Sequence, residues 1–112
     1  MSSALQVNAA SFEAEVIQSS VPVLIDFYAD WCGPCRMMGP VLDQVAQKVQ
    51  GKAKIVKVNV DQEPELAAAF KVSSIPLLVV MHQGKVVEHV MGAIPAQQVL
   101  AMLQKAMPAE EQ

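Results

Sequence analysis

Cys32 and Cys35 are the only two cysteines of the chain, and Gly33 and Pro34 separate them. Two cysteines this close either bind a metal or exchange disulfides. The nearly unbroken apolar run Val21 to Ala29 precedes them and predicts a buried strand, and a helical pattern follows them. Cys32 is therefore expected at a helix N-terminus, where unpaired N–H groups and the positive end of the helix dipole favour a thiolate.

The second cysteine lies one helical turn beyond the first, close enough to close a small disulfide ring. Cys32 could then attack a substrate disulfide, and Cys35 could resolve the mixed disulfide. In the reduced protein we expect Cys32 to be the exposed attacking thiol and Cys35 the shielded one.

Other uses of two cysteines fit the sequence poorly. A zinc site needs about four ligands, and the remaining candidates, His82 and His89, do not lie at zinc-finger spacing from Cys35. Haem attachment needs a histidine after the second cysteine, where the chain has Arg36. An iron–sulfur cluster would lack ligands, and a static structural disulfide does not suit so small a loop. No metal site is expected.

Asp26 is the only charged residue in the run Val21 to Ala29. Because a buried carboxylate is costly to ionise, its pKa should be raised. Such a carboxyl group beneath the dithiol could exchange protons with Cys35, or it could be a structural acid held by hydrogen bonds. Lys57 could approach Asp26 from a neighbouring strand and offset its burial, or its ammonium could simply reach solvent.

Trp31 is the only tryptophan, and it lies in a turn with Asp30 and the residues between the cysteines. A turn is a poor place for a core residue, so we expect a flat docking surface formed by Trp31, Pro34, Ile75 and Ala93. The fluorescence emission of Trp31 should change when the neighbouring disulfide is reduced.

Seven methionines are present. Met37 lies off the inward face of its predicted helix, either as an adaptable partner contact or as a surface residue without a role. The methionines at core-like positions are Met81, Met91, Met102 and Met107.

The remaining periodicity predicts alternating strands and helices. Strands are expected at Leu5 to Val7, Val21 to Ala29, Ala53 to Val60, Leu77 to Met81 and Val86 to Met91. Helices are expected after a cap at Ser11, at Cys35 to Val49, at Pro64 to Phe70, and from Pro95 to Met107. The order βαβαβαββα predicts an α/β fold, with a central mixed five-stranded sheet flanked by four helices and closed by a hairpin at Gln83–Gly84.

Composition limits the class of protein. The 112 residues suit a single domain, 1–112, and 53% apolar with 17% charged residues predicts a folded chain. A net charge of −3 gives no support for nucleic-acid binding, and no apolar run of membrane-spanning length occurs. The N-terminus lacks the pattern of a signal peptide, so we expect a cytoplasmic protein.

The segment from Asp26 to Arg36, DFYADWCGPCR, is similar to the active-site segment of the thioredoxin family. The resemblance extends from Ser11 to Met107. Further family marker positions are occupied by Pro40, Lys57, Asp61, Ile75-Pro76, Gly84 and Gly92. The chain departs from the commonest pattern at Tyr28, where many members have Trp, and at Leu77, where Thr is frequent. Neither departure removes a catalytic group.

The resemblance implies roles for individual residues. Asp26 would deprotonate Cys35, and Lys57 would act with it. The Ile75–Pro76 bond would be cis and face the dithiol, which leaves the Ile75 backbone free to pair with a substrate strand. The implied substrate-binding residues are Trp31, Gly33, Pro34, Ile75, Pro76, Gly92 and Ala93.

The function expected from this resemblance is general protein-disulfide reduction by a monomer that needs no cofactor beyond its own Cys32–Cys35 pair. Its partners would be disulfide-containing client proteins and a flavin-dependent thioredoxin reductase, linked to NADPH or to ferredoxin. One alternative is an oxidase or isomerase, but Gly33–Pro34 supplies no donor that would over-stabilise the thiolate. The other alternative is a thioredoxin-fold binding module or chaperone subunit.

Overall fold

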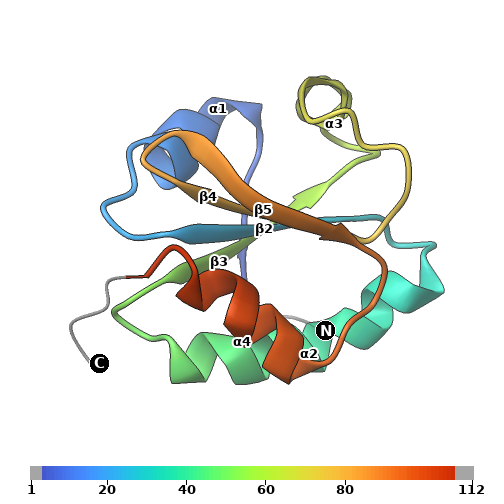
Figure 1. Ribbon diagram of the computed structural model, residues 1–112. Helices are drawn as coiled ribbons and strands as arrows, with labels where there is room; N and C mark the ends of the chain where they lie inside the picture. Colours follow the sequence, from blue (N-terminus) through green and yellow to red (C-terminus); the bar gives the residue numbers. More distant parts are fainter. Residues whose placement is uncertain (1–3, 108–112) are drawn as a thin grey trace.

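A computed structural model describes residues 4–107. In this part of the chain, a mixed sheet of five strands lies between two layers of helices (Figure 1). The elements, in chain order, are β1 (Leu5–Gln6), α1 (Ala9–Phe12), the π-helical turn η1 (Glu13–Ile17), β2 (Val23–Tyr28), α2 (Gly33–Lys48), β3 (Lys54–Asn59), α3 (Pro64–Ala69), β4 (Leu77–His82), β5 (Lys85–Met91) and α4 (Ala96–Gln104). The predicted fold class is confirmed.

The strand order across the sheet is β1-β3-β2-β4-β5. The β3 strand is parallel to both β1 and β2, whereas β4 is antiparallel to both β2 and β5. Strand β2 is therefore central and is hydrogen-bonded on both sides. Because the cysteine segment follows β2, the dithiol is anchored to the central strand, which has a hydrogen-bonded neighbour on each side.

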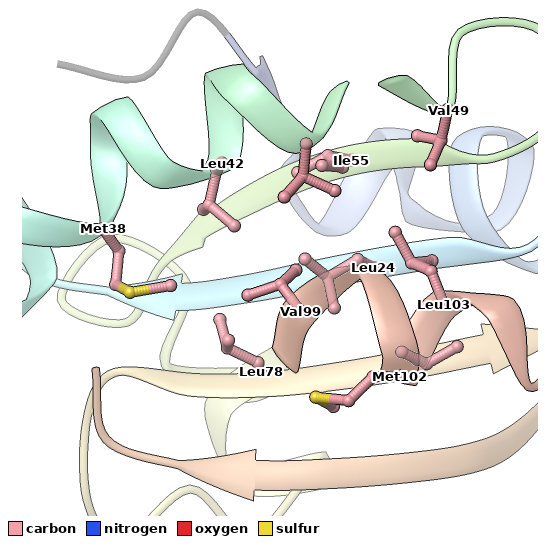
Figure 2. Packing of buried hydrophobic residues seen from close by; sticks show 11 residues of the cluster. Leu24, Met38, Leu42, Val49, Ile55, Leu78, Val99, Met102 and Leu103 are labelled. Atoms are coloured by element: carbon pink, nitrogen blue, oxygen red, sulfur yellow. The ribbon is translucent and has the colours of Figure 1, made fainter. Parts of the chain in front are cut away.

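Alternate residues of β2 serve two separate cores. Leu24 faces α2 and α4, where Met38 and Leu42 of α2 and Val99, Met102 and Leu103 of α4 enclose it (Figure 2). The next residue, Ile25, faces the opposite side, where η1 and α3 cover the sheet. Helices α2 and α4 thus lie on one face and α1 and α3 on the other (Figure 1).

Helix α2 begins two residues earlier than predicted. Gly33 is its first residue, Cys32 is its N-cap, and Pro34 lies in its first turn, where a missing N–H costs nothing. The helix continues through Pro40 to Lys48. Gly51 follows with φ +82°, a backbone conformation that favours glycine.

The predicted cap of the first helix is wrong. Asn8, not Ser11, is the N-cap: its side-chain oxygen accepts a hydrogen bond from the Ser11 N–H at 2.9 Å. The Ser11 hydroxyl accepts in return from the Asn8 N–H at 3.1 Å, which completes a capping box. Ser11 is therefore the third residue of the helix, and the helix begins earlier than we expected.

The hairpin between β4 and β5 turns at Gln83 and Gly84, both with positive φ, as in a type I′ turn. The core position predicted for Met91 is wrong, because its side chain is 57% exposed. β5 is an edge strand, and most of its side chains are exposed. Met81 and Met102 are buried, and Met107 packs partly buried against the α2–α4 core.

Candidate active site

The two cysteines form a disulfide across the first turn of α2. The backbone N–H of Cys35 donates a hydrogen bond to Sγ of Cys32 at 3.2 Å. That sulfur therefore occupies the position of an N-cap acceptor, where the end of the helix stabilises negative charge. A free thiolate at Cys32 would receive the same donor.

Exposure does not distinguish the two cysteines in this oxidised form, because Cys32 is 4% and Cys35 is 6% exposed. Their surroundings do distinguish them. Sγ of Cys32 lies 3.9 Å from the carbonyl oxygen of Ile75, in the loop before β4. Cys35 instead lines a pocket beneath the helix, together with Asp26. The expected difference in thiol exposure remains a prediction for the reduced protein.

Asp26 is buried at the centre of the sheet, with 4% of its surface exposed. Burial raises the pKa of Asp26 to about 7, and the positive charge of Lys57 opposes this rise. Its Oδ1 atom has no hydrogen-bond partner among residues 4–107. Asp26 and Lys57 are register partners on the parallel strands β2 and β3. This register places Lys57 on the strand next to Asp26, which is what the first of the two possibilities for Lys57 requires.

A pocket of about 620 Å³ connects these groups. Its walls come from β1, β2, β3, the loop before α2, and α2 itself. The lining residues are Gln6, Asp26, Tyr28, Ala29, Asp30, Cys35, Arg36, Gly39 and Lys57. A carboxyl group whose pKa is about 7 therefore shares one cavity with the inner cysteine, so that proton exchange between them has a route.

The outer side of the dithiol carries Trp31, which is 68% exposed as predicted. Its indole N–H donates a hydrogen bond to Oδ2 of Asp61 at 2.8 Å. Trp31 and Ile75 also line a shallow hollow with residues of the segment that follows α3. Pro34 and Ala93 are exposed but do not line this hollow.

The predicted cis bond between Ile75 and Pro76 is present. The N–H of Gly92 donates a hydrogen bond to the Pro76 carbonyl oxygen at 2.8 Å, which ties the end of β5 to this loop. Gly92 has φ +95°, and a Cβ atom there would have no neighbour within 4 Å. Backbone conformation, rather than crowding within the chain, is the reason for glycine at this position.

Three side-chain contacts of the site were not predicted from the sequence. The Tyr28 hydroxyl donates to Oε1 of Gln6 at 2.9 Å, and the Lys57 ammonium lies 5.6 Å from the centroid of the Tyr28 ring. The Arg36 guanidinium donates to the carbonyl oxygen of Asp30 at 2.8 Å. In the sequence, Tyr28 is notable only as a departure from the family pattern. Nothing in the sequence marked Gln6.

Within residues 4–107, no group of three or more His, Cys, Asp or Glu side chains is placed to hold a metal ion. None of the helices there is long and apolar enough to cross a membrane.

A redox-active cysteine pair at a helix N-terminus, above a buried carboxyl group, defines a thiol–disulfide oxidoreductase that uses its own cysteines as the redox group. The family model for thioredoxin matches residues 3–105. The chain is 48% identical to thioredoxin 1 of Nostoc sp. over 94% of this chain and 98% of that protein. It is 49% identical to thioredoxin of Haemophilus influenzae over 88% of this chain and 92% of that protein. The chain belongs to the thioredoxin family.

Proposed function

We propose that the chain reduces disulfides in other proteins, with Cys32 as the attacking thiol and Cys35 as the resolving thiol. The observation that carries this assignment is the different surroundings of the two sulfurs. Sγ of Cys32 accepts the Cys35 N–H at the helix terminus, whereas Cys35 shares the inner pocket with Asp26. The family does not favour the alternative of a binding module without redox activity.

The reaction consists of two exchanges. The Cys32 thiolate attacks one sulfur of the partner disulfide, a mixed disulfide forms, and the other partner sulfur leaves as a thiolate that takes up a proton. The Cys35 thiolate then attacks Sγ of Cys32, and the second partner sulfur leaves. The partner gains two electrons and two protons, and this chain is left with the Cys32–Cys35 disulfide.

Asp26 supports the second exchange. Cys35 must lose its proton before it can attack, and the carboxylate of Asp26 in the shared pocket can accept that proton, directly or through water. A base with a pKa near 7 is matched to this task at neutral pH. Lys57 favours the ionised form of this base, because its positive charge opposes the effect of burial.

Substrates would bind on the outer side of the dithiol. The docking surface would comprise Trp31, Gly33, Pro34, Ile75, Pro76, Gly92 and Ala93, with the Ile75 backbone pairing with an extended segment of the client. Met37, which is also exposed, extends this surface by one helical turn. A flavin-dependent reductase, linked to NADPH or ferredoxin, would return the disulfide to the dithiol. The protein would act as a cytoplasmic monomer.

Insulin reduction tests the function most directly. Wild type should accelerate the reduction of insulin by dithiothreitol, and Cys32→Ser should fall to the uncatalysed rate because no attacking thiol remains. The reduction potential tests the direction of electron flow, and it should be well below the ~−180 mV typical of disulfide isomerases. Catalysis by Cys32→Ser, or a potential above that value, would contradict the proposal.

A further inference from the structure

A row of three side chains crosses the sheet beneath the first turn of α2. Gln6 of β1 is the register partner of Lys57 of β3, and Lys57 is the register partner of Asp26 of β2. All three line the same pocket. The lysine therefore lies between an amide on one side and the buried carboxyl group on the other.

Tyr28 contacts two members of this row, Gln6 and Lys57. It follows Asp26 by two residues on β2, so both side chains lie on the same face of the sheet. Its hydroxyl donates to Oε1 of Gln6 at 2.9 Å, which links β2 to β1 across the intervening strand β3. Its ring lies 5.6 Å from the ammonium of Lys57, within the range of a cation–π contact.

We propose that the hydrogen bond between Tyr28 and Gln6 is a clasp that keeps Lys57 in the pocket beside Asp26. Tyr28 is then a positioning residue for the proton acceptor of Cys35, and the two-residue strand β1 contributes to the chemistry by supplying Gln6. This inference rests on the proposed function, because a positioned base matters only if Cys35 must be deprotonated.

The need for a clasp follows from the nature of lysine. Its ammonium is strongly hydrated and sits on a flexible stem, so it tends to turn toward open water. The pocket is partly open to solvent and would allow this movement. A fixed aromatic face near the ammonium opposes such movement, and the hydroxyl bond to Gln6 fixes the ring.

The other charges around the pocket do not replace Lys57. Arg36 reaches the pocket from α2, but its guanidinium donates to the Asp30 carbonyl oxygen. Asp30 lies in the same lining, but an acidic side chain cannot supply a positive charge to Asp26. Lys57 is the positive charge that opposes the effect of burial on the carboxyl group. Moving its ammonium away should therefore change the proton affinity of Asp26.

The test is a carbonyl-carbon NMR titration of Asp26 in the full-length disulfide form. Tyr28→Phe keeps the ring and removes only the hydroxyl, and Gln6→Leu removes the acceptor. Each should raise the pKa of Asp26 by about 0.5, roughly a threefold gain in proton affinity. The double variant should match either single variant, because both changes break one bond.

The control is the same pair of changes in a Lys57→Met background. Lys57→Met alone should raise the pKa of Asp26 further than either clasp variant, and adding Tyr28→Phe should then have no effect. An unchanged pKa in both single variants would overturn the clasp, as would a rise that persists without the lysine. If Tyr28→Phe failed to fold by circular dichroism, Gln6→Leu on the exposed strand β1 would test the same bond.

A kinetic readout separates this inference from the proposed function. In single-turnover reduction of a disulfide peptide, Tyr28→Phe should move the acidic limb of the resolution rate to higher pH and leave the alkaline plateau unchanged. Failure of the wild type to reduce the peptide would contradict the proposed function. The NMR titration of Asp26 would still decide whether the clasp exists. If the wild type is active and Tyr28→Phe does not shift its pH–rate profile, only the clasp proposal is contradicted.

Discussion

The middle of α2 and its first turn cover the same strand and face of the sheet, yet they differ in how they meet it. In the middle, Leu42 packs against Leu24 with no exposed surface on either side chain (Figure 2). At the first turn, Cys35 meets Asp26 across an open pocket of about 620 Å³. One helix and one strand thus build close packing and a reactive cavity about two turns apart.

The comparison shows how the protein tolerates an unfavourable group. A buried carboxyl group with an unpartnered oxygen lowers stability once it ionises. The apolar contacts two residues along β2 hold the helix in place regardless of that ionisation. We expect changes at the reactive region to alter reactivity and to alter stability in a way that depends on pH. Changes at the packed region should lower stability and leave reactivity unaltered.

The largest effect should come from Cys35→Ser. Without a resolving thiol, Cys32 can form the mixed disulfide but cannot release the client, so catalytic turnover should fall to background. A covalent complex with a disulfide client should accumulate and be visible on non-reducing gels, and dithiothreitol should separate its two chains by reducing the mixed disulfide. Under reducing conditions, the melting temperature should remain close to that of the reduced wild type. Sustained turnover by this variant would contradict the two-step exchange.

Asp26→Asn should stabilise the protein at alkaline pH. The folded-state pKa of about 7 exceeds the ordinary value of 3.8, so the folded state holds the proton more tightly than the unfolded state between these values. Wild-type stability from this group is complete below about pH 4 and is lost as pH rises through 7. Since a tenfold change in proton affinity is worth ~1.4 kcal/mol, the loss is on the order of 4 kcal/mol by pH 8–9.

The measurement is urea unfolding of wild type and Asp26→Asn at a series of pH values, both as disulfides. The difference should be small at pH 4 and grow toward pH 8. A difference that does not depend on pH would mean that the pKa of the Asp26 carboxyl group is not raised in the folded state. Resolution of the mixed disulfide should slow in the same variant, so stability and reactivity should move in opposite directions.

At the packed region, Leu42→Ala should cost about 3 kcal/mol, because it opens a cavity at a fully buried position. The folded fraction should retain the reduction potential and turnover of the wild type. Gln44→Ala, at an exposed position of the same helix, is the matched control and should change stability by less than ~0.5 kcal/mol. A clear change in reduction potential with Leu42→Ala would show that the two regions are coupled.

The smallest effect is expected at the exposed hydrogen bond between Trp31 and Asp61, on the outer side of the dithiol. Asp61→Ala removes the acceptor of the Trp31 indole, an exposed hydrogen bond worth about 1 kcal/mol or less. Reduction should raise Trp31 emission in the wild type, because the neighbouring disulfide quenches the indole. The rise should be smaller once the ring is free to turn away. Equal responses in both proteins, with two thiols released in each, would show that this bond does not hold the ring.

Predictions from sequence succeed where periodicity and strand adjacency suffice. The apolar run that contains Asp26 predicts a central strand, and β-branched residues around Lys57 predict its neighbour. A parallel sheet then brings the two residues together. The cysteine pair needed only its place between this strand and a helix. These features depend on backbone pattern, which the sequence expresses directly.

The errors and omissions concern features that backbone pattern does not encode. Asn8 and Ser11 are both good capping residues, and only the completed capping box shows which one begins the helix. Met91 alternates like a core residue, but it lies on an edge strand. The bond between Gln6 and Tyr28 depends on the register of a two-residue strand and on side-chain reach, neither of which a local pattern contains.

Pairing of β2 on both sides has a consequence for amide hydrogen exchange. Its N–H groups lie in the centre of the sheet, so their exchange requires opening that approaches global unfolding, whereas β1 and β5 can fray from the edges. The slowest-exchanging amides should therefore lie in β2, immediately before the cysteine segment. The dithiol can then pass through many cycles of oxidation and reduction while the strand that carries it almost never opens.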